Sequence, residues 1–99
     1  MIIPKKRPNP VGEYIREDIL KELKMSQGDL AEALKVSRKT INDLVNNKRS
    51  LSADMALRLG KFTKTSPQLW LGLQQDTDLW DAFHSEKAKE IKNILSYAA

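Results

Sequence analysis

Apolar residues recur every three or four positions along most of this chain, which is the spacing of amphipathic α-helices. Nowhere do apolar and polar residues alternate for long enough to indicate a β-strand. The first apolar stripe begins after Pro10, which suits the first helical position because its missing N–H needs no partner there. This stripe predicts a helix over residues 10–23 and consists of Val11, Ile15, Ile19 and Leu23.

Two short helices are predicted next. Ser26 is a good N-cap for a helix over residues 27–34, and Asp29 supplies the acidic half of a capping box. Ser37 is the cap of the following helix. Asn46-Asn47 ends that helix, because asparagine tolerates the left-handed conformation. The apolar positions of the two helices are Leu30, Ala31, Leu34, Ile41, Leu44 and Val45.

The remaining residues predict two more helices, an extension and a tail. Ser52 marks the start of a fourth helix, and Ser66-Pro67 opens a fifth that continues to Phe83. We therefore predict a flexible tail over residues 1–9, a helical domain over 10–83 and a C-terminal helical extension over 84–99. The tail has two prolines and three consecutive basic residues. It is either a frayed terminus, which is the commoner case, or a basic arm that contacts DNA or a partner.

Composition narrows the class of protein. A chain of 99 residues fits one small domain, and the absence of cysteine removes disulfides and thiolate chemistry. No apolar run approaches the ~20 residues of a membrane span, and no secretory signal is visible, so we expect a cytoplasmic protein without membrane contact. The net charge of +4 is by itself a weak sign of nucleic acid. Five basic residues nevertheless fall within fifteen positions: Lys35, Arg38, Lys39, Lys48 and Arg49.

Catalysis finds little support in the residues. The chain has one histidine, His84, and no cysteine, so neither a catalytic triad nor a zinc site can be assembled from the usual groups. The four glycines form no phosphate-binding loop. We expect no catalytic residue, no metal and no cofactor.

The second and third predicted helices fit a DNA-reading helix-turn-helix, which we place at residues 26–48. Ala31 is small where the two helices must cross closely, and Val36 is apolar where it must plug the turn. Ile41 and Leu44 can anchor the second helix to the core. The opposite face then presents polar side chains to a major groove: Arg38, Lys39, Asn42 and Asp43.

The segment 26–41 resembles the helix-turn-helix of the phage repressor/Cro type, often called the XRE family, and the likeness continues through residues 46–49 and 52–59. With Pro10-Gly12-Glu13 and Thr65-Ser66-Pro67…Trp70-Leu71, the chain looks specifically like the HigA branch of bacterial antitoxins. That branch includes VapI- and VapA-like proteins. The resemblance implies an all-α, five-helix, lambda-repressor-like DNA-binding domain with the short helical extension behind it.

The resemblance also implies roles for individual residues. Gln27 would contact a DNA phosphate and brace the second helix of the motif, while Arg38 and Lys39 would face the groove. Arginine suits guanine because its fork reaches O6 and N7 together, and Asn42 could address adenine if its side chain reaches. The expected DNA-binding residues are Gln27, Ser37, Arg38, Lys39, Thr40, Asn42, Asp43, Lys48 and Arg49.

Two positions depart from the family pattern, and Asp43 raises a separate question. Lys35 stands where the turn usually has glycine, so the turn is either slightly reshaped or strained by the ~1 kcal/mol of a left-handed lysine. Asn47 stands where glycine is more common, and can adopt the same conformation. Asp43 places an acid on the groove face. It would either accept from cytosine or pair with Lys39 four residues earlier, and the internal pair is favoured.

The function implied by the resemblance is that of an antitoxin, which binds palindromic operator DNA, represses its own operon and neutralises a ribonuclease-type toxin encoded beside it. A stand-alone transcriptional regulator and an interaction module that does not read DNA are the alternatives. A two-fold dimer would read two half-sites ~34 Å apart, so we expect a homodimer through the fifth helix and the extension. Packing within one chain is the commoner role of such residues. The expected interface residues are Trp70, Leu73, Trp80 and Phe83.

Overall fold

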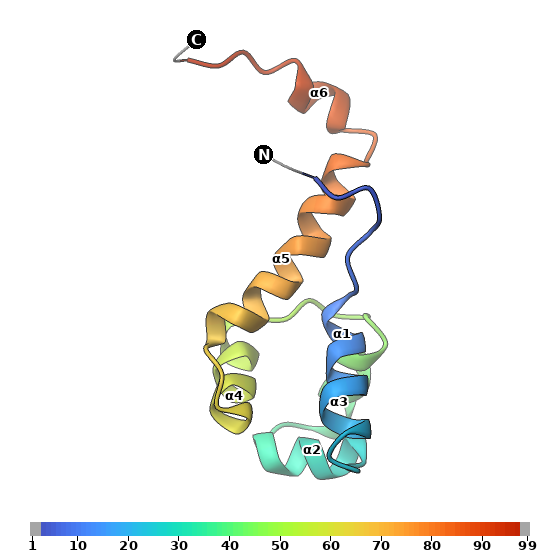
Figure 1. Cartoon of the computed structure of the whole chain (residues 1–99), viewed down its shortest axis with the longest axis vertical. Helices are drawn as coiled ribbons and strands as arrows, with labels where there is room; N and C mark the ends of the chain where they lie inside the picture. The colour runs from blue at the N-terminus through green and yellow to red at the C-terminus, as the bar shows by residue number, and fades with distance from the viewer. Residues whose placement is uncertain (1–2, 98–99) are drawn as a thin grey trace.

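The computed structural model describes residues 3–97, and over this range it contains helices and no strand. The predicted all-α fold is confirmed (Figure 1). The helices in chain order are α1 (Val11–Tyr14), η1 (Ile15–Lys21), α2 (Gln27–Leu34), α3 (Arg38–Val45), α4 (Ala53–Thr63), α5 (Pro67–Phe83) and α6 (Ala88–Lys92).

The first helix is shorter than its apolar stripe suggested. α1 passes without a break into the π-helical segment η1, which ends at Lys21. The chain then turns through Lys24, which has a left-handed φ of 54°, and the Met25 N–H donates to the Leu20 carbonyl at 2.8 Å. Because Leu23 lies beyond the helix, it is 53% exposed. Its placement in the core was wrong.

Serine caps fix where four of the helices begin. The side chain of Ser26 accepts from the Asp29 N–H, and the Asp29 carboxylate accepts from the Ser26 N–H, so the capping box is complete. The other three serine side chains accept a backbone N–H three residues on in the same way. A cap of this kind contributes about 1 kcal/mol. The predicted caps Ser26, Ser37 and Ser66 are confirmed, and Ser52, which the sequence placed at the start of the fourth helix, caps α4.

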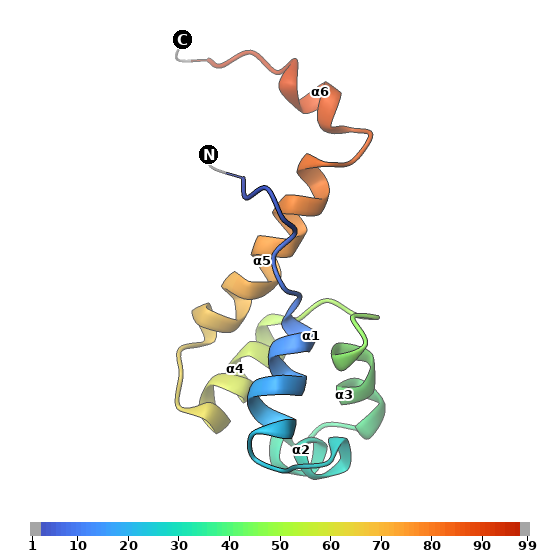
Figure 2. The same ribbon diagram turned by 45° about the vertical axis from the view of Figure 1, so that its right-hand side comes forward.

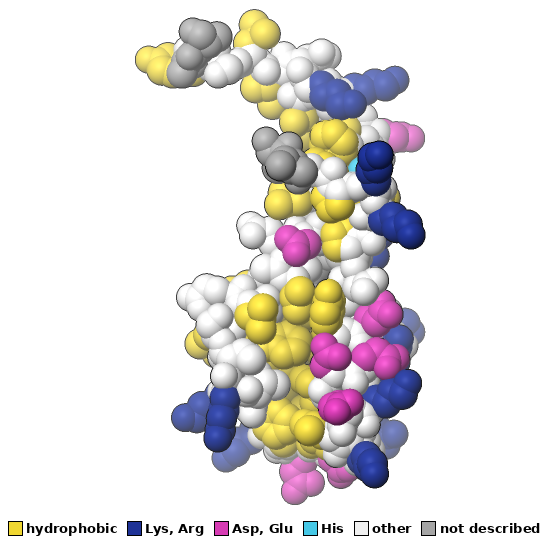
Figure 3. All heavy atoms as spheres, in the orientation of Figure 1, with side chains coloured by type: hydrophobic (Ala, Val, Ile, Leu, Met, Phe, Trp, Pro, Cys, Tyr) yellow, Lys and Arg dark blue, Asp and Glu magenta, His cyan; other side chains and the backbone are white. Residues whose placement is uncertain are grey.

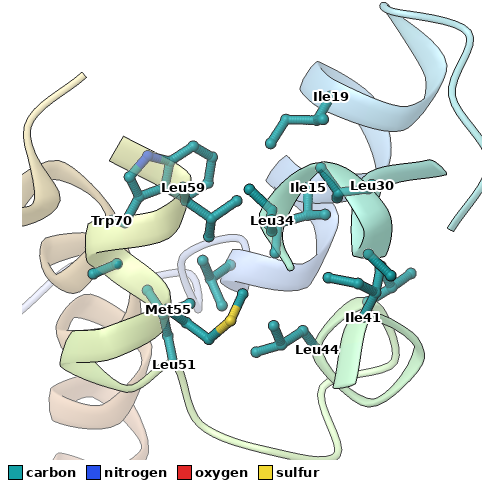
Figure 4. Packing of buried hydrophobic residues seen from close by; sticks show 14 residues of the cluster. Ile15, Ile19, Leu30, Leu34, Ile41, Leu44, Leu51, Met55, Leu59 and Trp70 are labelled. Carbon is teal, nitrogen blue, oxygen red and sulfur yellow. The ribbon is translucent and has the colours of Figure 1, made fainter. Parts of the chain in front are cut away.

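The hydrophobic core lies between α1–η1, α2, α3, α4 and the first turns of α5 (Figure 4). Trp70 of α5 closes it beside Leu59, and its indole N–H donates to Thr65 Oγ1 at 2.9 Å. Burying each large aliphatic side chain contributes roughly 1.5–3 kcal/mol. The largest fully buried side chains are those of Ile15, Leu30, Ile41, Leu44 and Leu59.

The second half of α5 and the residues after it leave this globular part. The molecule measures 51 × 23 × 21 Å, and residues 78–97, which we call the arm, form its narrow end (Figure 1). Apart from Ala88, every arm residue is at least partly exposed. Figure 3 shows hydrophobic side chains gathered along the arm. Its exposed large hydrophobic residues are Leu79, Phe83, Ile91, Ile94, Leu95 and Tyr97.

The N-terminal segment, residues 3–9, lies along the outer half of α5 (Figure 2). Arg7 donates from Nε and Nη2 to the two carboxylate oxygens of Asp81, at 2.8 and 3.0 Å. The Trp80 indole N–H donates to the Pro4 carbonyl at 3.1 Å. The segment thus forms no helix of its own but is attached at two points to the arm. Among the residues described, no helix combines the length and hydrophobicity that a membrane crossing requires.

Candidate DNA interface

The turn between α2 and α3 keeps the left-handed conformation that the motif requires. Lys35 has φ 59° and ψ 45°, so the turn is strained by its lysine and has not been reshaped. The Val36 N–H donates to the Ala31 carbonyl at 2.9 Å, which closes the turn. Arg58 of α4 adds a bond that the sequence did not suggest, because its Nη1 donates to the Leu34 carbonyl at 2.9 Å. The C-terminal end of α2 is therefore held both by the turn and by α4.

A second arginine holds the far end of α3. The Nη2 of Arg16, from η1, donates to the Val45 carbonyl at 2.9 Å. The last carbonyls of a helix have no partner inside it and carry a partial negative charge, so a guanidinium there is favourable. Nothing in the sequence marked Arg16 or Arg58 for these contacts. In the structure they position the two helices of the motif.

The exposed face of α3 holds the four polar residues expected there. Arg38, Lys39 and Asn42 are exposed, and Asp43 is half-buried. Lys39 Nζ lies 2.9 Å from Asp43 Oδ2, which is the internal pair that the sequence favoured. This hydrogen bond lowers the pKa of Asp43 below its ordinary value, with smaller contributions from the positive charges of Arg49 and Lys48. Asp43 is therefore a carboxylate at neutral pH, and much of the charge of Lys39 is balanced.

The second cation of this face is Arg38. It makes no hydrogen bond or ion pair with any of residues 3–97. Beside it, Asn42 Nδ2 donates to Gln27 Oε1 at 3.1 Å, so the first residue of α2 is tied to the middle of α3. Asn42 still has its carbonyl oxygen and one N–H free for a base edge.

Ser37 and Thr40 form hydrogen bonds with one another. Ser37 Oγ accepts from the Thr40 N–H at 3.1 Å, and the two hydroxyls lie 2.9 Å apart. Together they fix the first turn of α3. Ser37 is exposed and Thr40 is half-buried.

The loop after α3 presents Lys48 and Arg49 to solvent. Asn47 has the left-handed φ of 58° that the sequence predicted for this position. The Lys48 N–H donates to the Asp43 carbonyl at 2.7 Å. At its other end, the loop is fastened to α5, because the Leu51 N–H donates to Gln74 Oε1 at 2.8 Å. The role of Gln74 was missed, since nothing in the sequence links residues 51 and 74.

The four residues expected at a dimer interface fall in two places. Trp70 is buried in the core of its own chain, and Leu73 packs partly against that core. Trp80 and Phe83 lie on the arm. The Trp80 ring stacks on His84, with ring centroids 3.8 Å apart, and Phe83 stays 41% exposed. Of the four, only the last two are placed to meet a second chain.

Comparisons with known proteins agree with this geometry. A family model described as helix-turn-helix matches residues 16–70. An uncharacterised HTH-type transcriptional regulator of Haemophilus influenzae is 38% identical over 85 residues, which cover 86% of this chain and 79% of that protein. Antitoxin HigA-1 of Vibrio cholerae is 36% identical over 93 residues, covering 92% and 88%. The structure of Pseudomonas aeruginosa antitoxin HigA with the higBA promoter superposes with a TM-score of 0.84 at 41% identity, covering 94% of this chain and 100% of that one.

Proposed function

The chain belongs to the helix-turn-helix family of HigA-type antitoxins, and we propose on that basis that it binds the operator of its own operon, represses that operon and neutralises a ribonuclease-type toxin encoded beside it. The observation that carries the DNA-binding part is the exposed polar face of α3, held by Arg16, Arg58 and Gln27, in a chain similar to an antitoxin solved with its promoter. The toxin-binding part rests on the family alone. The family is one of DNA-binding regulators, and we propose no catalytic role.

We assign the DNA-reading domain to residues 10–83, with Arg38 as the main base-reading residue. Arg38 has no partner within residues 3–97, so its fork is available for a guanine, whereas Lys39 is held by Asp43. Lys48 and Arg49 would contact backbone phosphates. A regulator of this kind acts where bacterial operators lie, in the cytoplasm.

A dimer is the form in which we propose that the protein binds DNA. One recognition helix reads only a few base pairs, and a two-fold dimer reads two half-sites of a palindrome ~34 Å apart. The arm supplies the surface, since it exposes Leu79, Phe83, Ile91, Ile94 and Leu95 within a short length of chain. Large contiguous apolar patches are uncommon on monomers and mark interaction sites. A second copy of the arm is the partner we propose.

The DNA-binding role is tested by two substitutions whose effects on operator binding should differ, because one removes a base contact and the other a phosphate contact. Arg38→Ala is expected to cost ~1–3 kcal/mol of operator binding and to relax one base position, because a base contact is lost. Lys48→Ala is expected to weaken all sequences alike and to reduce the dependence of affinity on salt, because a phosphate contact is lost. Fluorescence anisotropy with the operator and with a scrambled duplex measures both. Affinity untouched by either change, or independent of salt, would contradict DNA reading.

The alternative is a stand-alone regulator, and the relative named only as a transcriptional regulator keeps it in view. Both functions share the DNA interface, so DNA binding does not separate them. Co-purification with the product of the neighbouring gene does. A stable complex with a ribonuclease-type protein supports the antitoxin, and a regulator that footprints its promoter but captures no neighbour supports the alternative.

A further inference from the structure

A polar cleft of about 290 Å³ lies where the N-terminal segment, the loop after α3 and α5 meet. Arg7 enters it from the N-terminal segment, and Lys48 and Arg49 enter it from the loop. Asp78 and Asp81 of α5 also line it, so its charged groups carry one net positive charge. Residues 41 and 42 positions apart in sequence thus contribute cations to one surface. That surface continues from the loop already proposed to contact DNA.

The guanidinium of Arg7 is held on one edge and open on the other. Its Nε and Nη2 donate to the two oxygens of Asp81, at 2.8 and 3.0 Å. A guanidinium has five N–H groups, so both N–H groups of Nη1 and one of Nη2 remain without a partner in this pair. The side chain is 43% exposed. Asp81 therefore orients Arg7 without using up its capacity to donate.

We propose that Arg7 is a further DNA-binding residue, which donates from its open edge to a backbone phosphate of the operator beside the phosphates contacted by Lys48 and Arg49. The planar fork of arginine matches the geometry of phosphate oxygens. A side chain already held in place loses less conformational freedom on binding. The phosphate belongs to DNA rather than to a free anion because the cleft borders the loop that follows the recognition helix. The inference rests on the proposed function.

The inference is tested by the salt dependence of operator binding. Each phosphate contact makes the slope of log K against log salt concentration more negative by about 0.9. Arg7→Ala is expected to reduce the slope by about 0.9 per half-site, or about 1.8 for a dimer on a palindrome. The affinity of the variant is then lower at 50 mM salt, and its deficit shrinks by about tenfold on going to 200 mM. Anisotropy titrations at several salt concentrations give both quantities.

The matched control removes two charges from the same segment. Lys5 and Lys6 are exposed and do not line the cleft, so the double variant Lys5→Ala/Lys6→Ala is expected to keep the slope of the original protein. Equal loss of slope in the double variant and in Arg7→Ala would overturn the assignment, because general attraction would then explain both. An unchanged slope in Arg7→Ala, with a reduced slope in Lys48→Ala, would overturn the role of Arg7 alone. An unchanged slope in Lys48→Ala as well would count against the proposed function itself.

Discussion

Replacing Gly12 with alanine is expected to lower the free energy of unfolding by about 3 kcal/mol, the upper part of the range for overpacking in a tight interior. A Cβ on Gly12 would overlap the Leu44 carbonyl oxygen and come within 2.8 Å of the Val45 carbonyl oxygen and 2.7 Å of Asn47 Oδ1. Two of these three atoms are backbone, so no side-chain rotation can relieve the overlap. Urea denaturation followed by circular dichroism measures the change.

The control for this substitution is Gly72→Ala, in the middle of α5. Outside its chain neighbours and the backbone of its own helix, no atom lies within 4 Å of a Cβ built there. Alanine is favoured over glycine inside a helix by roughly 0.5–1 kcal/mol. The same chemical change is therefore expected to stabilise the protein at one glycine and destabilise it at the other. A Gly12→Ala protein as stable as the original would show that α1 and the end of α3 do not pack as closely as described.

Gly12 also connects stability with DNA binding. The atoms it touches end the recognition helix α3 and begin the loop that carries Lys48 and Arg49. Any shift that accommodates a methyl group moves that end of α3. The folded fraction of Gly12→Ala is therefore expected to bind the operator more weakly, whereas Gly72→Ala keeps its affinity.

Replacing Phe83 with glutamate is expected to lower operator affinity by about 10²- to 10³-fold, because it removes the second half-site from the same binding event. Phe83 is 41% exposed on the arm, and a carboxylate there would have to be buried, unpaired, between two copies of the chain. Light scattering is expected to show a monomer, and anisotropy gives the affinity.

Leu57→Glu is the control for the arm. Leu57 lies on α4 and is 61% exposed, so its replacement puts the same charge at another apolar surface position. We expect Leu57→Glu to remain dimeric and to bind the operator within a few-fold of the original. A Phe83→Glu protein that stays dimeric would place the interface elsewhere on the molecule.

Local signals in the sequence predicted much of the fold. Apolar spacing of three to four residues located the helices, and serine caps located where four of them begin. The extent of the first helix was wrong at Leu23, because the apolar spacing continues past the point at which η1 ends. Apolar residues spaced by four positions fit both an α-helix and a short π-helical segment, so the spacing alone did not mark η1.

Contacts between residues far apart in the chain could not be predicted from spacing. Arg58 binds a carbonyl 24 residues earlier, and Arg7 pairs with a carboxylate 74 residues later. A charged residue that binds another element has the same local pattern as one that faces water. For the candidate site, the sequence therefore predicted the exposed face of α3, the loop after it and the bracing residue Gln27. It did not predict the contacts of Arg16, Arg58 and Gln74.

The elongated shape has a consequence for how the protein is ordered. Its radius of gyration is 16.1 Å, whereas a compact chain of this length has about 13 Å. The difference lies in the arm, where ordering each residue costs ~1–2 kcal/mol of backbone entropy and little apolar surface is covered within one chain. Local opening should therefore begin in the arm. As protein concentration rises, amide hydrogen exchange is expected to slow in the arm and to stay constant in the globular part. The arm would then become stable only when a second copy of the chain packs against it.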